Sequence, residues 1–500
     1  MLEKIKENKE KIFLYILFFS YAISSLIITI LHESWCDEAQ AWLIARDLDV
    51  IGIIRQMKYE GHSCLWHMIL MPFAKLGFPF ATAKYISWGF CTVAAWMILM
   101  KAPFSKLLKA LFLFNPAMIY LIPAITRCYC LIPFLVSILS ILYKEKEEHP
   151  YKYAVALAFL VNVHVVMIPM AALLVLTFWG EKLILKRKEL EKEEKIRLWL
   201  SLGFVALGAL IMFLQIYSAL FGCTILDSTN KMNNILNLEY IKYNLNLTLV
   251  QIGNYLYHNE KWGLYGMIVV CMLLVLATVL HPRQGFIFWL ELIFLVFVQT
   301  FVWFVNKQRA VIPVFLLLFW CWNARQEREN GKLFGKIPET VFIDLACAVF
   351  LIVTMYNYVM IRDDIVGKYS TSKEVASFIE EKIPKGSVFI CPNNEKVTSI
   401  IAYTKKGDYQ FYAPNSKKYY TYISWDRQWQ NLSSMKDIEN AIDDLKNEGH
   451  ENIYVIIGKY ITYADMDIKV EKFPKIYVAD DSFHTYYAEY EDYIVYKVNF

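Results

Sequence analysis

The 500-residue sequence has few of the motifs that mark soluble enzymes and metal-binding domains. Its ten cysteines are scattered, with no Cys-x-x-Cys pair and no Cys/His cluster of the kind that binds zinc. The polar C-terminal part has no glycine-rich phosphate loop and no Ser/His/Asp signature. The formal net charge is only +4, which gives no indication of nucleic acid as a partner. Cysteines such as Cys91 and Cys321 lie inside apolar runs, which favours buried, structural side chains.

Long apolar runs are what the sequence does contain. Hydrophobic residues make up 57% of the chain, and several runs approach the roughly 20 residues that cross a bilayer. The first run, Ile12 to Leu31, is longer than a signal-peptide core and has no small-residue cleavage site. It follows a lysine-rich tail that the positive-inside rule places in the cytoplasm. We therefore expect a retained anchor in a multi-pass protein of the cell membrane.

The distribution of Lys and Arg predicts a polytopic α-helical protein with about 11 transmembrane helices and its C-terminus outside. The first external loop is expected at residues 32–61. The run 65–80 is expected to dip at the outer face or to pair with 85–100 as one bent unit. Residues 153–179 are expected to form two short spans meeting outside at His164, and residues 221–262 a polar external loop.

A change in composition near residue 362 divides the chain into a membrane domain, residues 1–361, and an extracytoplasmic α/β domain, residues 362–500. Helices are expected at 372–382, 397–403 and 437–447, and strands at 387–391, 452–457 and 493–497. Alternation of helices with short strands is typical of a small α/β domain. This part is rich in aromatic residues, as at 419–422 and 425–429, which can stack on sugars or simply pack in strands.

Two adjacent carboxylates, Asp37 and Glu38, follow directly on the first apolar run. Charge so close to hydrocarbon is costly, so acids at such a place tend to be functional. Ala41, Ile44 and Ala45 would share one face of a helix that begins at the two acids and lies along the membrane surface. The alternative is that both carboxylates only cap the N-terminus of this helix.

The predicted topology brings polar residues from distant parts of the chain to the outer membrane face. Acids there can act as a general base and as a metal ligand or positioning group, and Arg can bind phosphate through a bidentate fork. The combination suits a lipid-phosphate sugar whose anomeric carbon is attacked by a hydroxyl group. The residues are Asp37, Glu38, Glu60, His62, Arg127, His164, Lys307 and Arg309.

Each of these residues also has a structural interpretation. Lys307 and Arg309 can be interfacial anchors whose charged ends reach water. His164 can hydrogen-bond a backbone carbonyl at a helix break, and Arg127 can be a satisfied polar group between helices. The joint placement, more than any single residue, indicates a functional site.

Three segments resemble the GT-C superfamily of membrane glycosyltransferases, which includes the protein O-mannosyltransferases and the aminoarabinose transferase that modifies lipid A. They are Trp35–Arg46, Tyr59–Trp66 and Arg127–Pro133. The resemblance implies a polyprenyl-phosphate sugar as donor, Asp37 as catalytic base, Glu38 as its neighbour in the acidic motif, and His62 near donor or acceptor. The expected substrate-binding residues are Glu60, His62, Arg127, Tyr129, His164, Lys307 and Arg309.

The chain departs from the family pattern at two places. Ser63 and Cys64 stand where related chains usually carry two prolines, and Ile125 stands where they often carry an acid. Some members of the superfamily need a divalent ion and others do not, so no metal is assigned.

The leading hypothesis is an inverting glycosyltransferase that moves one sugar from a lipid-phosphate donor to an acceptor on the outer side of the cytoplasmic membrane. The acceptor is an envelope glycan, a lipid or a protein. The content of Lys, Ile, Asn and Tyr is compatible with a low-GC bacterium. One alternative is a transporter or flippase for lipid-linked saccharides, in which the acids couple protons. Another is a glycan polymerase or ligase that works through the 221–262 loop.

Overall fold

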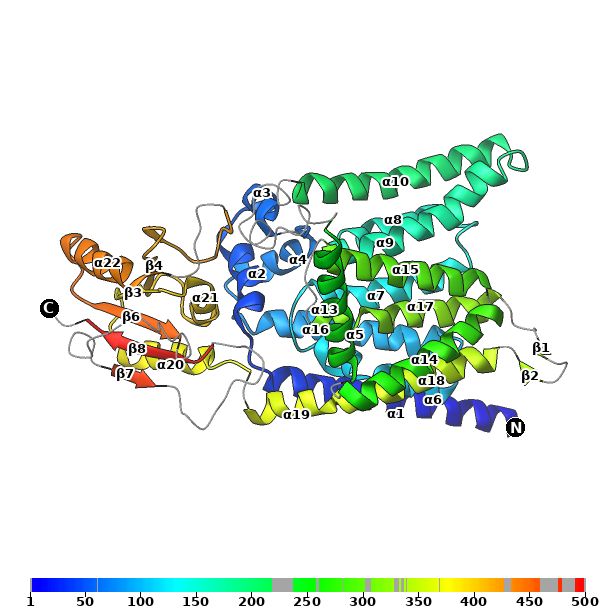
Figure 1. The fold of residues 1–500 in the computed structure, drawn as a ribbon, viewed down its shortest axis with the longest axis horizontal. Helices are drawn as coiled ribbons and strands as arrows, with labels where there is room; N and C mark the ends of the chain where they lie inside the picture. The colour runs from blue at the N-terminus through cyan, green and yellow to red at the C-terminus, as the bar shows by residue number, and fades with distance from the viewer. Residues whose placement is uncertain are drawn as a thin grey trace.

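The structure is a computed structural model that describes residues 2–60, 62–217, 237–257, 260–280, 282–301, 307–327, 332–333, 337–338, 340–367, 369–426, 433–458, 475–478 and 491–498. A bundle of helices forms one end of the molecule and a β-sheet with its own helices forms the other (Figure 1). The N-terminal end of α1 lies at the end of the bundle farthest from the sheet. Helices α2, α3 and α4 lie between the bundle and the sheet.

The first half of the chain folds into α1 (Leu2–Leu31), α2 (Cys36–Asp47), α3 (Val50–Glu60), α4 (Leu65–Lys75), α5 (Thr82–Lys101), α6 (Lys106–Leu113), α7 (Leu131–Tyr143), α8 (Pro150–Val161), α9 (Ile168–Val175) and α10 (Lys192–Ile216). The second half of the bundle contains α13 (Leu238–Tyr257), α14 (Glu260–Leu280), α15 (Pro282–Phe301), α16 (Lys307–Ala310), α17 (Ile312–Glu327), α18 (Thr340–Thr354) and α19 (Tyr358–Gly367). The predicted domain boundary at 361/362 falls within α19.

Among the described residues, five helical segments are long and apolar enough to cross a membrane. They are Asn8–Leu31, Thr82–Lys101, Val165–Leu185, Lys192–Ile216 and Asp344–Lys382. Shorter apolar helices occur at Cys128–Tyr143, Pro150–Val161 and Gly285–Phe301. These segments are those of a multi-pass membrane protein, while the number of about eleven crossings stays a prediction.

The segment around His164 forms a break between two helical stretches, as its sequence indicates. Helix α8 ends at Val161, and His164 precedes a 3-10 turn at Val165–Met167 that continues into α9. The Nδ1 atom of His164 accepts a hydrogen bond from Val166 N at 3.2 Å, which satisfies one backbone donor at the start of the new helix. The break therefore holds the His164 ring at the end of the bundle.

Residues 238–257 of the polar external loop expected at 221–262 form helix α13, so this part of the segment is helical instead of irregular. Leu238, Ile241, Leu245 and Leu249 recur every three or four residues, a helical spacing that the intervening Asn and Tyr residues obscure. Residues 218–236 of the expected loop lie outside the described residues. In Figure 1, α13 runs across the bundle rather than along it.

The described part of the C-terminal region contains a six-stranded sheet in the order β5-β4-β3-β6-β8-β7. Its strands are β3 (Val388–Ile390), β4 (Gln410–Ala413), β5 (Lys418–Tyr419), β6 (Ile453–Gly458), β7 (Lys475–Val478) and β8 (Tyr493–Lys497). Strand β3 pairs in parallel with β4 and β6, and the other pairs are antiparallel. A two-stranded hairpin of β1 (Lys332–Leu333) and β2 (Ile337–Pro338) lies at the opposite end of the molecule.

Helices cover both faces of this sheet. Val388 and Ile390 pack with α22 (Met435–Asn447), while Phe389 belongs to the core shared with α20 (Ser372–Lys382) and α21 (Asn394–Tyr403). This split follows from the period of two along a strand. The helix expected at 372–382 and the strand expected at 493–497 occur with those bounds.

The sheet region and the bundle share one continuous apolar core, which runs through α2 and α21. Hydrogen bonds fix the junction at the start of α2. Cys36 N donates to Glu491 Oε1 at 2.8 Å, and Ser34 N donates to the Tyr403 hydroxyl at 3.2 Å. The C-terminal region therefore helps to place the helix that carries the acidic pair.

Candidate active site

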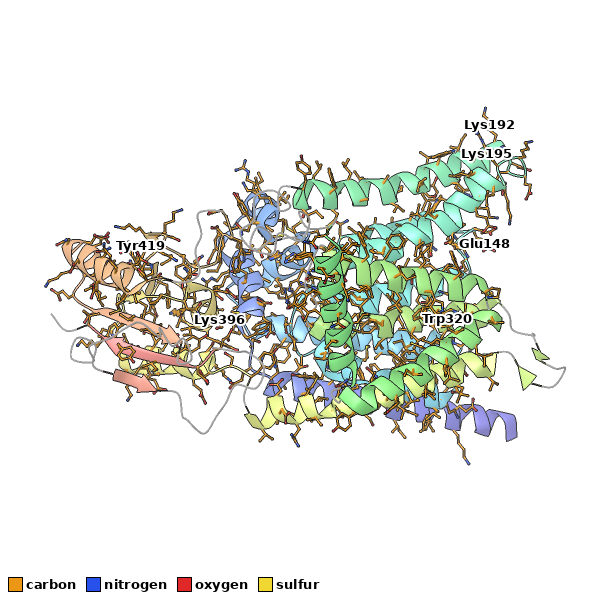
Figure 2. All side chains as sticks on the ribbon, viewed as in Figure 1. Glu148, Lys192, Lys195, Trp320, Lys396 and Tyr419 are labelled. Atoms are coloured by element: carbon orange, nitrogen blue, oxygen red, sulfur yellow. The ribbon has the colours of Figure 1, made fainter. Side chains whose placement is uncertain are left out.

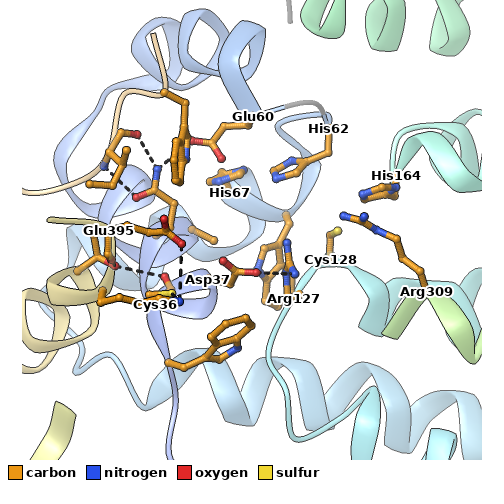
Figure 3. Close-up of a pocket in the computed structure, with 18 residues that line it drawn as sticks. Cys36, Asp37, Glu60, His62, His67, Arg127, Cys128, His164, Arg309 and Glu395 are labelled. Atoms are coloured by element: carbon orange, nitrogen blue, oxygen red, sulfur yellow. Dashed lines mark hydrogen bonds and ion pairs between the residues drawn. The ribbon is translucent and has the colours of Figure 1, made fainter. Parts of the chain in front are cut away.

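A cavity of about 380 Å³ lies at the junction of the bundle, helices α2 to α4 and the C-terminal region (Figure 3). Its size is within the usual range for small-molecule sites. Six residues predicted from the sequence line it, namely Asp37, Glu60, His62, Arg127, His164 and Arg309. They come from four distant parts of the chain.

Asp37 and Arg127 form an ion pair inside this cavity (Figure 3). Arg127 Nη1 lies 2.7 Å from Asp37 Oδ2, and the two side chains are 18% and 33% exposed. Burial by itself lowers the pKa of Arg127, but the carboxylate of Asp37 outweighs it and raises this pKa above its usual range. The pair therefore places a carboxylate and a permanent cation at the same accessible point.

Glu38 does not line the cavity. Its side chain is fully buried, and its two oxygens accept four hydrogen bonds. Oε1 accepts from Thr126 N at 2.7 Å and from Ser34 Oγ at 3.3 Å, while Oε2 accepts from Trp35 N and His32 Nε2, both at 3.1 Å. Glu38 thus binds the backbone next to Arg127 and the backbone that opens α2, which places it as a positioning residue.

His32 connects Glu38 to the end of the bundle. Its Nδ1 atom lies 2.8 Å from Asp364 Oδ2 on α19, and its ring is fully buried between the two carboxylates. Burial lowers the pKa of His32, but Asp364 and Glu38 outweigh it and raise this pKa to about 9. A charged imidazole between two acids compensates their burial.

Arg309 is the second guanidinium of the cavity and is only 2% exposed. Its Nε atom donates to the Tyr129 hydroxyl at 2.7 Å, and the ring of Tyr129 lies 5.1 Å from that of His164. Gln308, the preceding residue of α16, donates to the carbonyls of Leu121 and Ile125. Tyr129 therefore supports Arg309 from behind instead of lining the cavity itself.

Lys307, also predicted as a substrate contact, is the first residue of α16. Its side chain lies outside the part of the chain that the structure describes.

His62 and His67 stack against each other on the wall of the cavity, with ring centroids 5.4 Å apart. The His62 ring also lies 6.3 Å from that of His164 (Figure 3). Burial lowers the pKa of His62 to about 4, helped by the nearby Arg127 and Arg309. His62 is therefore neutral at physiological pH and can accept or donate a hydrogen bond without adding charge.

Glu60 sits at the end of α3 and faces the cavity. Its Oε1 atom accepts hydrogen bonds from Gln40 Nε2 at 2.9 Å and Gln56 Nε2 at 3.1 Å. Burial raises the pKa of Glu60 to about 7 despite these bonds. Glu60 is thus an acid that titrates near neutral pH beside the Asp37–Arg127 pair.

The C-terminal region supplies cavity residues that sequence reasoning missed. These residues are Glu395, Lys396 and Thr398 of α21, together with Ile423 and Trp425. Lys396 Nζ lies 5.4 Å from the centre of the Trp35 ring and 3.6 Å from Cys36 Sγ. Burial lowers the pKa of Lys396, but Cys36 and the carboxylates of Glu395 and Glu491 raise it above its usual range.

Among the described residues, no group of three or more His, Cys, Asp and Glu side chains is placed to hold a metal ion.

The helical bundle with the C-terminal sheet packed on its end is the fold of a multi-pass membrane protein. No protein-family profile and no curated protein sequence matches the chain. Among solved structures, it is similar to ArnT from Cupriavidus metallidurans bound to undecaprenyl phosphate, with a TM-score of 0.53 and 11% identity over 97% of both chains. The apo form of that protein matches with a TM-score of 0.52 and the same identity and coverage. At this identity the likeness shows the fold alone.

Proposed function

We propose that this chain is an inverting membrane glycosyltransferase, which moves a sugar from a polyprenyl-phosphate donor to a hydroxyl group of an acceptor. One observation carries the proposal: the carboxylate of Asp37 and the guanidinium groups of Arg127 and Arg309 line a single cavity at the end of an apolar bundle. The binding of undecaprenyl phosphate by a protein of the same fold supports a polyprenyl phosphate as lipid partner.

In the proposed step, Asp37 acts as general base. It takes the proton of the acceptor hydroxyl, whose oxygen forms a bond to the anomeric carbon of the donor sugar. The bond from that carbon to the phosphate oxygen breaks, and the electron pair leaves with the phosphate. The donor phosphodiester, which carries one negative charge, becomes a polyprenyl phosphate monoester, on which a second negative charge develops. Arg127 and Arg309 are placed to stabilise this charge through charge-assisted hydrogen bonds.

An apolar groove of about 640 Å³ can accommodate the polyprenyl chain of the donor. Helix α4 borders both sites, because Leu65 and Ile69 line the groove while Trp66 and His67 line the cavity. A lipid in the groove would therefore present its phosphate to the cavity around the same helix. The other groove residues belong to α5, α7 and α8.

The proposed orientation puts the cavity on the outer side of the membrane. Glu148, Lys192 and Lys195 lie at the end of the bundle opposite Lys396 and Tyr419 (Figure 2). The basic segment 182–197 belongs to this distant end, as does the lysine-rich start of α1. The positive-inside rule assigns that end to the cytoplasm.

The position of the cavity favours transfer over the two alternatives. A flippase needs polar groups along a path through the membrane, whereas these charges gather at one end of the bundle beside the sheet (Figure 3). A polymerase or ligase working through residues 221–262 would place part of that segment at the site. Of the described residues that line the cavity, none comes from it.

The proposal is tested by sugar transfer from a panel of radiolabelled polyprenyl-phosphate sugars in purified membranes. Asp37→Asn keeps the size of the side chain but cannot act as a base, so we expect transfer to fall by roughly 10²–10⁴-fold. Asp49→Asn is the matched control, because Asp49 is an exposed carboxylate that caps Gly52 N outside the cavity. Wild-type transfer that Asp37→Asn leaves unchanged would show that Asp37 is not the base.

A further inference from the structure

A second cavity, of about 500 Å³, opens on the edge of the C-terminal sheet formed by β4 and β5. We call it the tyrosine groove and define it by Tyr409, Tyr419, Tyr420, Tyr422, Ser424 and Asp426. Tyr419 lies far from the helical bundle, whereas Lys396 marks the active-site cavity at the junction (Figure 2). The groove is therefore a site separate from the proposed catalytic cavity.

The floor of the groove and its rim differ in chemistry. Tyr409 and Tyr420 are 7% exposed and pack in the core, so they form the floor. Tyr419 is 44% exposed, and Tyr422 is half-buried. An exposed tyrosine at the rim contributes little to core packing and is suited to binding, because it offers an apolar face and a polar tip. Sugar rings present the matching surface, with a C–H face and hydroxyl groups around the edge.

The exposed ring of Tyr419 is held in place. Its hydroxyl donates to Glu448 Oε2 at 2.8 Å and lies 3.0 Å from His450 Nε2, and its ring packs edge-on against Tyr412 at 5.2 Å. A ring fixed in this way loses little conformational freedom when a ligand binds to its face. The rim is therefore preorganised.

One segment, residues 422–426, separates the tyrosine groove from the active-site cavity. Its side chains alternate between them: Ile423 and Trp425 line the active-site cavity, while Tyr422, Ser424 and Asp426 line the groove. A ligand longer than one sugar in the groove would therefore lie next to the catalytic cavity.

The separating segment is fixed to the helices that carry the active site. Ile423 N donates to Gln40 Oε1 at 3.0 Å, and Gln40 Nε2 donates back to Ile423 O at 2.7 Å. Gln56 Nε2 donates to Ser424 O at 3.1 Å. Gln40 lies one helical turn after Asp37 on α2, so the wall and the proposed base share one rigid element.

Trp425 has a strained backbone within this wall. Its φ of 54° lies in the left-handed region, which a bulky residue adopts only at an energetic cost. Such strain persists where the surroundings fix the conformation, and it gathers at binding sites. Here it keeps the buried Trp425 side chain on the wall of the active-site cavity.

We propose that the tyrosine groove binds the acceptor as a neutral saccharide chain, holding the sugar units beyond the one that receives the new residue. The inference rests on the proposed function and deepens it by naming the acceptor class. Charge favours a neutral chain, because Lys418 and Asp426 are the two charged residues among the described lining and their charges balance. An anionic polymer would be expected to need an excess of cations.

The test is direct binding to the purified full chain in detergent, without donor, measured by isothermal titration calorimetry. The probes are cellohexaose and chitohexaose, compared with glucose and N-acetylglucosamine. We expect at least one hexasaccharide to bind in the millimolar range or better and to bind more tightly than its monosaccharide. Asp49→Asn should bind the hexasaccharide as wild type does, since Asp49 is an exposed residue outside the groove.

Tyr419→Ala and Tyr422→Ala should each weaken hexasaccharide binding by about tenfold, the size of one lost ring contact. Tyr422→Phe keeps the ring and should bind within a few-fold of wild type. Tyr496→Ala is the matched control, because Tyr496 is a half-buried tyrosine of β8 outside the groove.

Two results would overturn the inference: no hexasaccharide binding to wild type at millimolar concentrations, or binding that both alanine variants leave unchanged. Tyrosine-dependent binding in a protein that transfers sugar from none of the donors would have a different meaning. It would support the saccharide-binding site and contradict the proposed glycosyltransferase reaction.

Discussion

Arg127 Nη1 lies 2.7 Å from Asp37 Oδ2, so the proposed base is held by the same cation that would bind the donor phosphate. A phosphate group entering the cavity competes for this guanidinium, because both partners are anions within reach of one fork. Donor binding would then loosen the carboxylate from Arg127 and leave it available to the acceptor hydroxyl. The ion pair thus links donor binding to activation of the base.

The first prediction concerns this pair. Arg127→Gln removes the cation, so the Michaelis constant for the donor should rise and turnover should fall by roughly 10²-fold or more. Arg127→Lys keeps the charge without the bidentate fork and should recover part of the loss. Steady-state transfer assays with varied donor check this. Arg46→Gln is the control, since Arg46 pairs with Asp47 outside the cavity. An equal loss of transfer in Arg127→Gln and Arg46→Gln would contradict a donor-binding role for Arg127.

The second prediction is that mutation distinguishes the role of Asp37 from that of Glu38. The Glu38 carboxylate accepts hydrogen bonds from two backbone N–H groups and from the His32 imidazole. Glu38→Gln places an amide donor against these donors, so the free energy of unfolding should fall by about 3 kcal/mol. Asp37→Asn should lose transfer while its melting temperature stays near that of wild type. Thermal unfolding in detergent, followed by tryptophan fluorescence, distinguishes the two. A Glu38→Gln protein as stable as wild type would refute the positioning role.

These different roles illustrate which features of the site could be predicted. The sequence places Asp37 and Glu38 at a helix start, but successive residues of a helix point about 100° apart, so only one of two neighbouring acids can face a given cavity. Which one does depends on His32, Ser34 and Thr126, whose positions follow from tertiary packing.

The convergence of Glu60, His62, Arg127, His164 and Arg309 was predictable in outline, because span ends on one side of a membrane share a depth. The contribution of Lys396 was not, because the packing of α21 on α2 joins residues some 360 positions apart. Nothing local in the sequence encodes such a contact. Helix α13 was missed for the opposite reason, since its local apolar spacing is present but diluted by Asn and Tyr.

The third prediction follows from the imidazole of His32 between two buried carboxylates. Its pKa is raised from 6.5 to about 9 in the folded protein, so the stability it contributes is fully present below pH 6.5. That stability is lost as pH rises through about 9 and amounts to about 3 kcal/mol. The unfolding free energy of wild type should therefore fall between these values. His32→Gln should remove this fall, while His149→Gln, at an exposed position, should retain it. The same fall in wild type and His32→Gln would rule out His32 as its source.

The last prediction concerns Glu60, whose shift has the opposite origin. Burial raises its pKa from 4.5 to about 7, so the folded protein binds a proton at Glu60 that the unfolded chain has already released. Stability should therefore decrease as pH rises from about 4.5 to 7, by at most about 3 kcal/mol. Glu60→Gln stays neutral and keeps an oxygen for the amide groups of Gln40 and Gln56, so its stability should be flat over this range. Glu439→Gln on the exposed face of α22 is the control and should follow wild type. Melting temperatures measured at intervals from pH 4 to 8 check this, and a decrease that persists in Glu60→Gln would assign the titration to another group.

The same titration should affect transfer. Above pH 7, ionised Glu60 would add a negative charge beside Asp37 and Arg127, so the transfer rate of wild type should change with a midpoint near 7. The transfer rate of Glu60→Gln should not change over this range.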